Sequence, residues 1–282
     1  MNKLNLRKIS DQVTELGVFH QENIFEDKEF EFVSGKLNNL TKKEKKIYFP
    51  TCLRDYLIKL LKFDLKKIFL SKRLIKIAND LDFPKIASDT LGSEVFLETL
   101  DCYLSEKSNN TILEWHNDIG YNSSKSKSTR DFLDKAKSTV FNIKTSKSSL
   151  GIKFFIYFTD VKKNDGVLGV VPYSHKIVYA LTKLILEKKI NLSSYWKLKD
   201  LRNLLLNINN KKHLLNYITS SELENFLERT KFIESAIGES SDHDLEMSRN
   251  SVVIFDELAI HRGSAPTLNN RLVLRYLYRV KL

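Results

Sequence analysis

One short segment combines an imidazole with a carboxylate at the spacing of a strand. It reads Glu-Trp-His-Asn-Asp over residues 114–118, with His116 and Asp118 two positions apart. Side chains at i and i+2 of an extended segment point to the same side, so both groups can reach a common point. Neutral imidazole together with carboxylate suits Fe(II), and a second, distant histidine would complete a facial triad with three open positions.

The C-terminal part of the chain offers that second histidine and a partner for an anion. His261 follows the apolar segment 252–255, and Arg271 stands ten residues further on, where it opens the last apolar segment. A guanidinium buried in a barrel needs an anion. A dicarboxylic co-substrate would supply one, held through two parallel hydrogen bonds.

Four blocks in this order resemble the phytanoyl-CoA dioxygenase family of Fe(II)/2-oxoglutarate oxygenases. They are His116-Asn117-Asp118, the strand–turn–strand segment 152–171, Pro172-Tyr173-Ser174-His175, and His261-Arg262-Gly263-Ser264 with Arg271. The similarity covers roughly residues 92–280 outside the stretch 177–230, and the segment 16–19 resembles the family's N-terminal start. Tyr173 stands where the family usually has Gly.

The resemblance implies an all-β core with helices, a double-stranded β-helix of the cupin-like jelly-roll type. It implies His116, Asp118 and His261 as iron ligands, and Arg271 as the partner of the distal carboxylate of 2-oxoglutarate. The cofactor is then Fe(II), with 2-oxoglutarate and dioxygen as co-substrates. The family decarboxylates 2-oxoglutarate to succinate and hydroxylates an unactivated C–H bond. Related halogenases have Gly or Ala at the position of Asp118, so its carboxylate favours hydroxylation or desaturation over halogenation.

The periodicity of apolar residues predicts a single domain over residues 1–282. Residues 1–91 are expected to be mainly helical support, residues 92–176 and 231–282 the β-helix core, and residues 177–230 a helical insertion. Gly17 should end a first helix, followed by a short strand at 18–20, and Phe83-Pro84 should end a helix within 52–81. The expected strands are 95–104, 112–116, 152–161, 167–171, 252–255 and 272–280, with 164–166 as a hairpin turn. The expected later helices are 177–188, 195–207 and 221–230, the last with a capping box of Ser221 and Glu224.

Two further cations share the faces of these strands. Lys153 lies on one side of its strand with Phe155 and Tyr157. Lys153 either assists an anionic co-substrate or substrate, or is a lysine at the rim of the barrel. Arg275, four residues after Arg271, points the same way. It either binds an acidic group of the substrate or pairs with a structural carboxylate.

The remaining polar candidates favour structural roles. His175 is interpreted as part of a structural signature beside the barrel, and Trp115 as a packing residue. Asp242-His243-Asp244 lies in a polar, Ser-rich stretch and is interpreted as a solvated turn. The Ser- and Lys-rich segment 122–130 is either a plain loop or a substrate lid.

Composition narrows the class of protein. The chain has 282 residues and is 42% hydrophobic, too apolar for a disordered chain. Its two cysteines, Cys52 and Cys102, cannot form a disulfide framework. No stretch approaches 18 apolar residues and the N-terminus has no signal-like segment, so we expect a cytoplasmic protein without a membrane span. The net charge of +11 comes from scattered lysines, which indicates either a solvated surface or attraction for an anionic partner.

These observations favour a hydroxylase acting on a small-molecule or carrier-linked substrate. The basic balance suits an anionic substrate, such as a CoA thioester or an acidic carrier protein. A nucleic-acid demethylase of the related iron-oxygenase type is an alternative. Those enzymes typically end with two arginines six apart, whereas Arg271 and Arg275 are four apart, so nucleic acid is not the expected partner. A non-catalytic cupin-like binding module is the third possibility.

Overall fold

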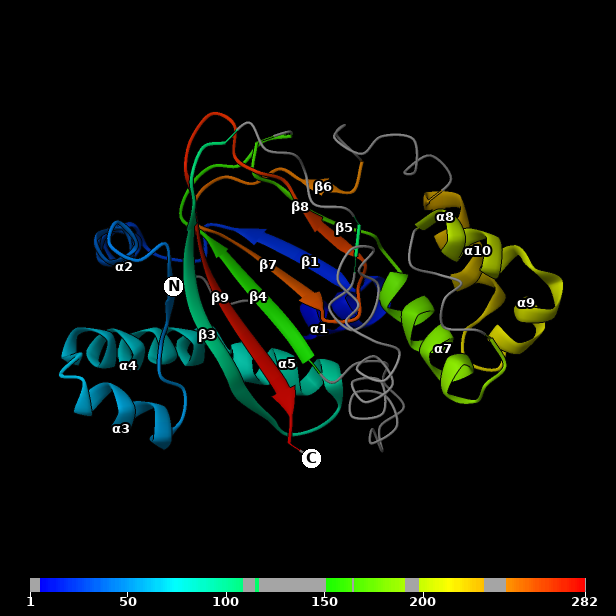
Figure 1. Cartoon of the computed structure of the whole chain (residues 1–282), viewed down its shortest axis with the longest axis horizontal. Coiled ribbons are helices and arrows are strands. Elements are labelled where there is room, and N and C mark those ends of the chain that lie inside the picture. The colour runs from blue at the N-terminus through cyan, green and yellow to red at the C-terminus, as the bar shows by residue number, and fades with distance from the viewer. Residues whose placement is uncertain are drawn as a thin grey trace.

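The core consists of two antiparallel β-sheets. The computed structural model describes residues 6–108, 115–116, 151–163, 165–190, 198–230 and 242–281. The larger sheet has the order β1 (Val18–Glu22), β7 (Ser251–Asp256), β4 (Gly151–Tyr157), β9 (Arg271–Val280), β3 (Val95–Ser105) and β2 (Lys46–Tyr48). The smaller sheet has the order β6 (Asp244–Leu245), β5 (Leu168–Val170) and β8 (His261–Gly263). Strands distant in the sequence are therefore neighbours in both sheets (Figure 1).

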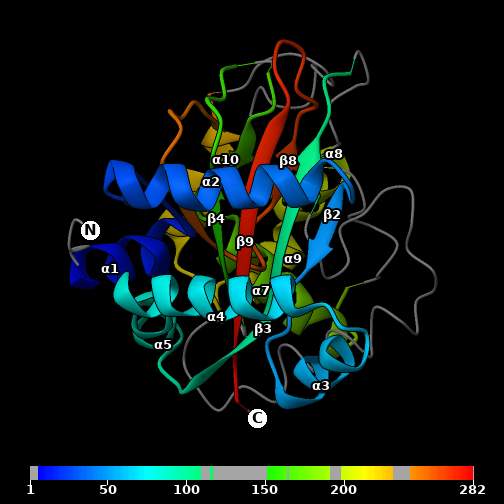
Figure 2. The same ribbon diagram turned by 90° about the vertical axis from the view of Figure 1, so that its left-hand side faces the viewer.

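Two groups of helices flank this core. The first contains α1 (Leu6–Leu16), α2 (Asp27–Thr41), α3 (Leu53–Leu61), α4 (Leu65–Asp80) and α5 (Phe83–Leu91). Of these, α2 and α4 cross over β9 and β3 on the outer face of the larger sheet (Figure 2). The second contains α7 (Ser174–Leu186), α8 (Leu198–Leu206), α9 (Ile208–Leu214) and α10 (Ser220–Arg229), which gather at the opposite end of the molecule (Figure 1).

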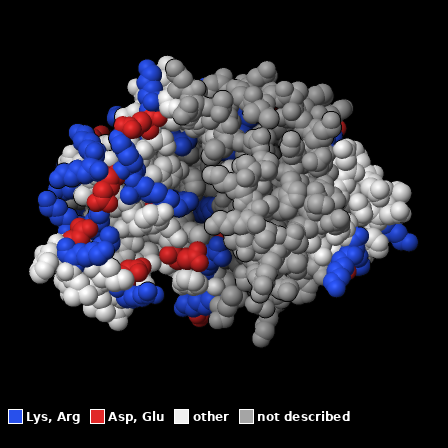
Figure 3. All heavy atoms as spheres, in the orientation of Figure 1, with Lys and Arg blue, Asp and Glu red and all other residues white. Residues whose placement is uncertain are grey.

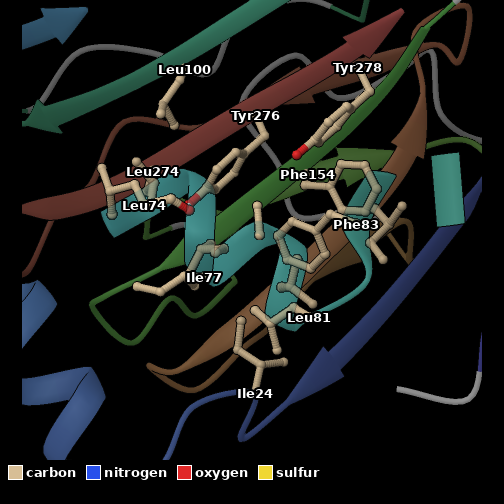
Figure 4. Close-up of a cluster of buried hydrophobic side chains, with 14 of the residues drawn as sticks. Ile24, Leu74, Ile77, Leu81, Phe83, Leu100, Phe154, Leu274, Tyr276 and Tyr278 are labelled. Atoms are coloured by element: carbon tan, nitrogen blue, oxygen red, sulfur yellow. The ribbon is translucent and has the colours of Figure 1, made fainter. Parts of the chain in front are cut away.

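The alternation of side chains along β4 and β9 gives the larger sheet two different faces. Phe154 and Tyr276 point to the outer face, where they meet the helices. The Phe83 ring of α5 stacks on Phe154 with 4.4 Å between ring centroids, and the Tyr276 hydroxyl donates to the Leu74 carbonyl of α4 at 3.0 Å (Figure 4). Helices and sheet thus bury one continuous apolar cluster, which supplies most of the driving force for folding.

The inner face of the larger sheet meets the smaller sheet. A separate apolar cluster joins Phe155 of β4 and Val253 of β7 to Leu168 and Val170 of β5. Lys153 stands on this inner face, as the alternation predicted. Polar side chains on the inner face, Lys153 among them, therefore lie on the side of the larger sheet that meets the smaller one.

One predicted connection is wrong. The segments 152–161 and 167–171 were expected to form a hairpin, but β4 pairs with β7 and β9, whereas β5 pairs with β6 and β8. The turn itself exists, with bridges from Lys162 to Asp165 and Gly166. The backbone bends after Tyr157, so the chain leaves the larger sheet before this turn and joins the smaller sheet after it.

Several helix boundaries also differ from the prediction. Phe83-Pro84 begins α5 rather than ending α4, since proline fits the first turn of a helix. The capping box of α10 is formed by Thr219 and Glu222, two residues before the predicted pair. Helices α2 and α9 were not predicted.

Other predicted elements agree with the structure or lie outside its described residues. The helix before Gly17, the strand after it, and strands β3, β7 and β9 are confirmed. The predicted residues 112–114 and the segment 122–130 lie outside the described residues. In the part of the chain that is described, no helix combines the length and the apolar character needed to cross a lipid bilayer.

Candidate metal centre

Two histidines from distant parts of the chain lie side by side at the edge of the smaller sheet. His116 and His261 form an antiparallel bridge in which each backbone N–H donates to the other's carbonyl, at 2.9 and 2.7 Å. Their ring centroids are 4.6 Å apart. Directly opposed residues of an antiparallel pair present their side chains on the same face, which is why two imidazoles meet here.

The tautomer of His261 follows from its hydrogen bond. Its Nδ1 lies 2.9 Å from the Ala259 carbonyl, which can only accept, so Nδ1 carries the proton. The lone pair of the ring then lies on Nε2, the form in which imidazole binds a metal. Burial, followed by the positive charge of Lys153, holds the pKa of His261 well below its ordinary value of 6.5. The ring is therefore neutral at physiological pH.

The third predicted ligand is not part of the described structure. Asp118 lies outside the described residues, so the structure places His116 and His261 together and leaves Asp118 a prediction. Within the described ranges, no group of three or more His, Cys, Asp or Glu residues is arranged to hold a metal ion.

A buried ion pair supports the two histidines from behind. Arg262 follows His261 and makes two hydrogen bonds to Asp244, from Nε to Oδ1 at 3.2 Å and from Nη2 to Oδ2 at 2.8 Å. The guanidinium also lies over the Trp115 ring, 4.6 Å from its centroid. Because Trp115 precedes His116, the cation–π contact joins the same two backbone segments that carry the histidines. The prediction that Trp115 packs is confirmed.

The environment of Asp244 corrects the sequence interpretation of residues 242–244. A solvated turn was expected, but Asp244 is buried in β6. A Cβ added at Gly169 would lie 2.6 Å from Asp244 Oδ1 and 2.8 Å from the Trp115 ring, so glycine is needed for this close approach. His243 points elsewhere, with Nε2 3.0 Å from the Arg229 carbonyl.

Arg271 lies at the beginning of β9 and has neutral partners. Its Nη1 donates to the carbonyls of Gly166 and of Ser264, the latter at 3.1 Å, and Nη2 donates to the Ser105 hydroxyl at 3.1 Å. Its Nε is buried without a hydrogen-bond partner, and no described carboxylate lies within ion-pair distance. A half-buried guanidinium without a counter-anion among the described residues is a candidate for binding an anionic ligand, because an uncompensated charge there is costly.

Arg275 has the structural carboxylate that the sequence left open. It pairs with Asp101 through two hydrogen bonds of 2.9 and 2.6 Å. The register of β3 against β9 places the two residues directly opposite each other. Asp101 is fully buried, so Arg275 neutralises its charge.

Lys153 is buried at the centre of β4, not exposed at a rim. Only 4% of its surface is accessible, and its Nζ lies 5.5 Å from the centroid of the Phe255 ring. That ring is in turn 5.2 Å from the His261 ring. Burial lowers the pKa of Lys153 to about 8. The ammonium is thus a readily neutralised cation close to the histidine pair.

His175 has the structural role that the sequence suggested. Its Nε2 bonds to the Thr14 carbonyl at 3.1 Å, and its ring fills the space over Gly17, where a Cβ would lie 2.4 Å from Nδ1. Tyr173, at the position where the family usually has Gly, adopts a left-handed φ of 65°. This backbone conformation explains why glycine suits that turn.

Sequence reasoning did not identify the aromatic lining of the inner face. Tyr103 is near Arg271, with the guanidinium 5.9 Å from its ring centroid, and burial raises its pKa. Burial likewise raises the pKa of Tyr157. The alternation in β4 signals Tyr157, whereas Tyr103 and Asp101 become visible only through the pairing of β3 with β9.

Comparison with known proteins establishes the fold. No family model matches the chain, and no curated protein matches its sequence. HygX from Streptomyces hygroscopicus, solved with nickel and 2-oxoglutarate bound, is 15% identical over 98% of this chain and 87% of its own, with a TM-score of 0.55. The epimerase SnoN, solved in complex with Fe3+, alpha ketoglutarate and nogalamycin RO, is 11% identical over 98% and 83%, with a TM-score of 0.53. The carbocyclase SnoK from nogalamycin biosynthesis is 11% identical over 99% and 87%, with a TM-score of 0.53.

The chain thus shares its fold, an antiparallel sheet core with helices, with SnoN and SnoK, which are non-heme alpha ketoglutarate-dependent enzymes. At these identities the likeness concerns the fold, and the chemistry has to be argued from the site itself.

Proposed function

We propose that this chain is a non-haem Fe(II)/2-oxoglutarate-dependent oxygenase of the phytanoyl-CoA dioxygenase type, built on a double-stranded β-helix. The observation that carries the proposal is the juxtaposition of His116 and His261. The two imidazoles come from segments far apart in the sequence. A structural role for this pair is poorly motivated, because Phe or Leu would fill an apolar space better than His. A shared fold with SnoN, SnoK and HygX supports the same assignment.

His116, His261 and Asp118 are the proposed iron ligands. The lone pair on His261 Nε2 fits this role, since the Ala259 carbonyl takes the proton of Nδ1 and orients the ring. When bound, iron with 2-oxoglutarate and dioxygen supplies the oxidising power for C–H hydroxylation, and 2-oxoglutarate is converted to succinate and carbon dioxide. The Phe255 ring beside His261 keeps one side of the site apolar and excludes water from it.

Arg271 is the proposed partner of the distal carboxylate of 2-oxoglutarate. Among the described residues its buried Nε lacks a hydrogen-bond partner, and its other nitrogens donate to carbonyls and a hydroxyl, none of which carries a negative charge. A carboxylate at Nε would supply both the missing acceptor and the missing charge. Lys153 is a further cation of the inner face, and we propose that it attracts an anionic group of co-substrate or substrate.

The proposed reaction is hydroxylation of a small-molecule or carrier-linked substrate. Asp118 favours this outcome over halogenation, because a carboxylate ligand there would occupy the position that a halide needs. The names of SnoN and SnoK, an epimerase and a carbocyclase, show that other outcomes occur on this fold. Mass analysis separates them, since a hydroxylated product gains one oxygen atom and an epimerised product keeps its mass.

The test is conversion of 2-oxoglutarate to succinate by the full chain with added Fe(II), together with binding of Mn(II) under anaerobic conditions. We expect His116→Ala and His261→Ala to abolish both. His20→Ala is the matched control, because His20 is exposed on β1 and belongs to no site. Undiminished metal binding by either variant of the histidine pair would reject the ligand assignment. If the natural chain binds Mn(II) but forms no succinate, it belongs with the non-catalytic binding modules.

A further inference from the structure

The hairpin of α3 and α4 carries an apolar surface that faces solvent. Eight of the fifteen exposed large apolar side chains in the described residues lie within its first 17 positions. They are Leu53, Leu57, Ile58, Leu60, Leu61, Phe63, Leu65 and Phe69, with exposures between 40% and 87%. We call these eight residues the hairpin surface. Isolated exposed apolar residues are ordinary, but a contiguous set of this size marks a site of interaction.

The orientation of α3 is inverted relative to a helix that covers a core. Leu53, Leu57 and Leu61 share one face at the i, i+4, i+8 spacing, and this apolar face points outward. None of the nine residues of α3 is buried. The helix is held on α4 through a polar contact, 3.1 Å between the Tyr56 hydroxyl and Ser71. The fold therefore does not need the leucines of α3 for its core.

The turn of the hairpin adds a second, independent observation. Helix α3 ends with Phe63 N–H bonding to the Leu60 carbonyl and Asp64 N–H to the Lys59 carbonyl, which is the Schellman pattern. Phe63 occupies the left-handed position of this motif, with φ 52°, where glycine is favoured. It is also 87% exposed. A bulky ring here strains the backbone and buries little against the described residues, as expected if the ring serves a contact outside the chain.

The charges around this surface identify its partner. Between Leu53 and Arg73 there are seven basic residues and two acidic ones. Arg54, Lys62 and Lys66 lie among the apolar residues and are exposed, and the described residues provide no ion pair for any of them. Figure 3 shows Lys and Arg, with Asp and Glu between them, over the side that carries α2, α3 and α4, and an uncharged projection at the position of α3.

We infer that the hairpin surface docks on an anionic phospholipid membrane, with α3 lying in the plane of the interface. The apolar side chains of a helix in this plane enter the boundary between the headgroups and the acyl chains of the lipids. The lysine and arginine side chains around them extend to the lipid phosphate groups. A second copy of this chain fits less well, because a self-contact would bring unpaired positive charges against each other. Nucleic acid fits less well, because bases stack on aromatic rings and six of the eight side chains are aliphatic. This inference is independent of the oxygenase chemistry.

The test is flotation of the full chain with vesicles of phosphatidylcholine containing phosphatidylserine, compared with phosphatidylcholine alone. We expect binding to the anionic vesicles that weakens as salt is added. Phe63→Gly should weaken binding to the vesicles by about tenfold or more, since it removes one aromatic side chain that the membrane would bury. It should leave the thermal midpoint equal or higher, because glycine relieves the left-handed strain. Loss of binding therefore cannot be attributed to unfolding.

Three double variants complete the test. Leu57→Ser with Leu61→Ser should also reduce binding, whereas Leu206→Ser with Ile208→Ser, on equally exposed residues at the other end of the molecule, should not. Lys62→Gln with Lys66→Gln should weaken binding to anionic vesicles by about 30-fold at about 1 kcal/mol per charge. Failure of the natural chain to bind anionic vesicles would overturn the inference. Unchanged binding by the Phe63→Gly variant would also overturn it. So would a chain that does not bind vesicles but sediments as a dimer, if Phe63→Gly dissociates that dimer.

Discussion

The buried pair of Arg262 and Asp244 leads to the most specific prediction about the stability of the site. Their side chains are 3% and 1% exposed, and Arg262 sits between the Asp244 carboxylate and the Trp115 ring. The substitution Asp244→Asn keeps the size of the side chain and removes its charge. It leaves a buried guanidinium without its counter-ion directly behind the backbone of His261.

The expected loss follows from the cost of an uncompensated buried charge. Removing one partner of a buried ion pair costs about 3–5 kcal/mol. The asparagine carbonyl can still accept one hydrogen bond and the contact with Trp115 remains, so we expect about 3 kcal/mol. For a chain of this size that corresponds to a fall of roughly 5 °C in the thermal midpoint. Because Trp115 and Arg262 flank the two histidines, we also expect weaker binding of Mn(II).

The assay is thermal or urea unfolding of three variants. These are Asp244→Asn, Arg262→Met, and the double variant Asp244→Leu with Arg262→Met, which replaces the pair by apolar groups. We expect the double variant to be more stable than Asp244→Asn, because no charge is left buried. An unchanged midpoint for Asp244→Asn would refute the reasoning. A double variant whose loss equals the sum of the two single losses would show that the two residues do not interact.

Three further predictions concern other parts of the molecule. Arg271→Ala should weaken 2-oxoglutarate binding by about 100-fold, measured by titration, while Mn(II) affinity stays the same; an unchanged Michaelis constant for 2-oxoglutarate would contradict its role. His175 has a pKa of about 4 in the folded chain against an ordinary 6.5, so the unfolded chain takes up its proton first as the pH falls. Up to about 3 kcal/mol of stability should be lost between pH 6.5 and pH 4, and His175→Gln should flatten this part of the unfolding profile. Gly17→Ala would place a Cβ 2.4 Å from His175 Nδ1 on a residue with a φ of 81°, so it should lower the unfolding free energy by about 2 kcal/mol or more. A thermal midpoint equal to that of the natural chain would contradict the packing described for this glycine.

Local patterns determined much of the fold because they depend on backbone geometry alone. The alternation of residues in 152–158 assigned Lys153 and Phe154 to opposite faces of a strand, and the structure confirms both placements. Gly17 ends α1 because a left-handed residue is favoured there, and that preference is readable from one position. The helical spacing of Phe30, Val33 and Leu37 in α2 is likewise a local signal.

The tertiary structure decided which distant segments meet. The turn at 164–166 indicates a change of direction, but only the competition between strands decides that β4 joins β7 and β9 while β5 joins β8. The same pairing sets Asp101 opposite Arg275 and brings His116 to His261. A sequence therefore specifies which side of a strand each group occupies, because successive side chains alternate. The partner across the sheet depends on how all strands together bury their apolar faces, and no local pattern contains that information.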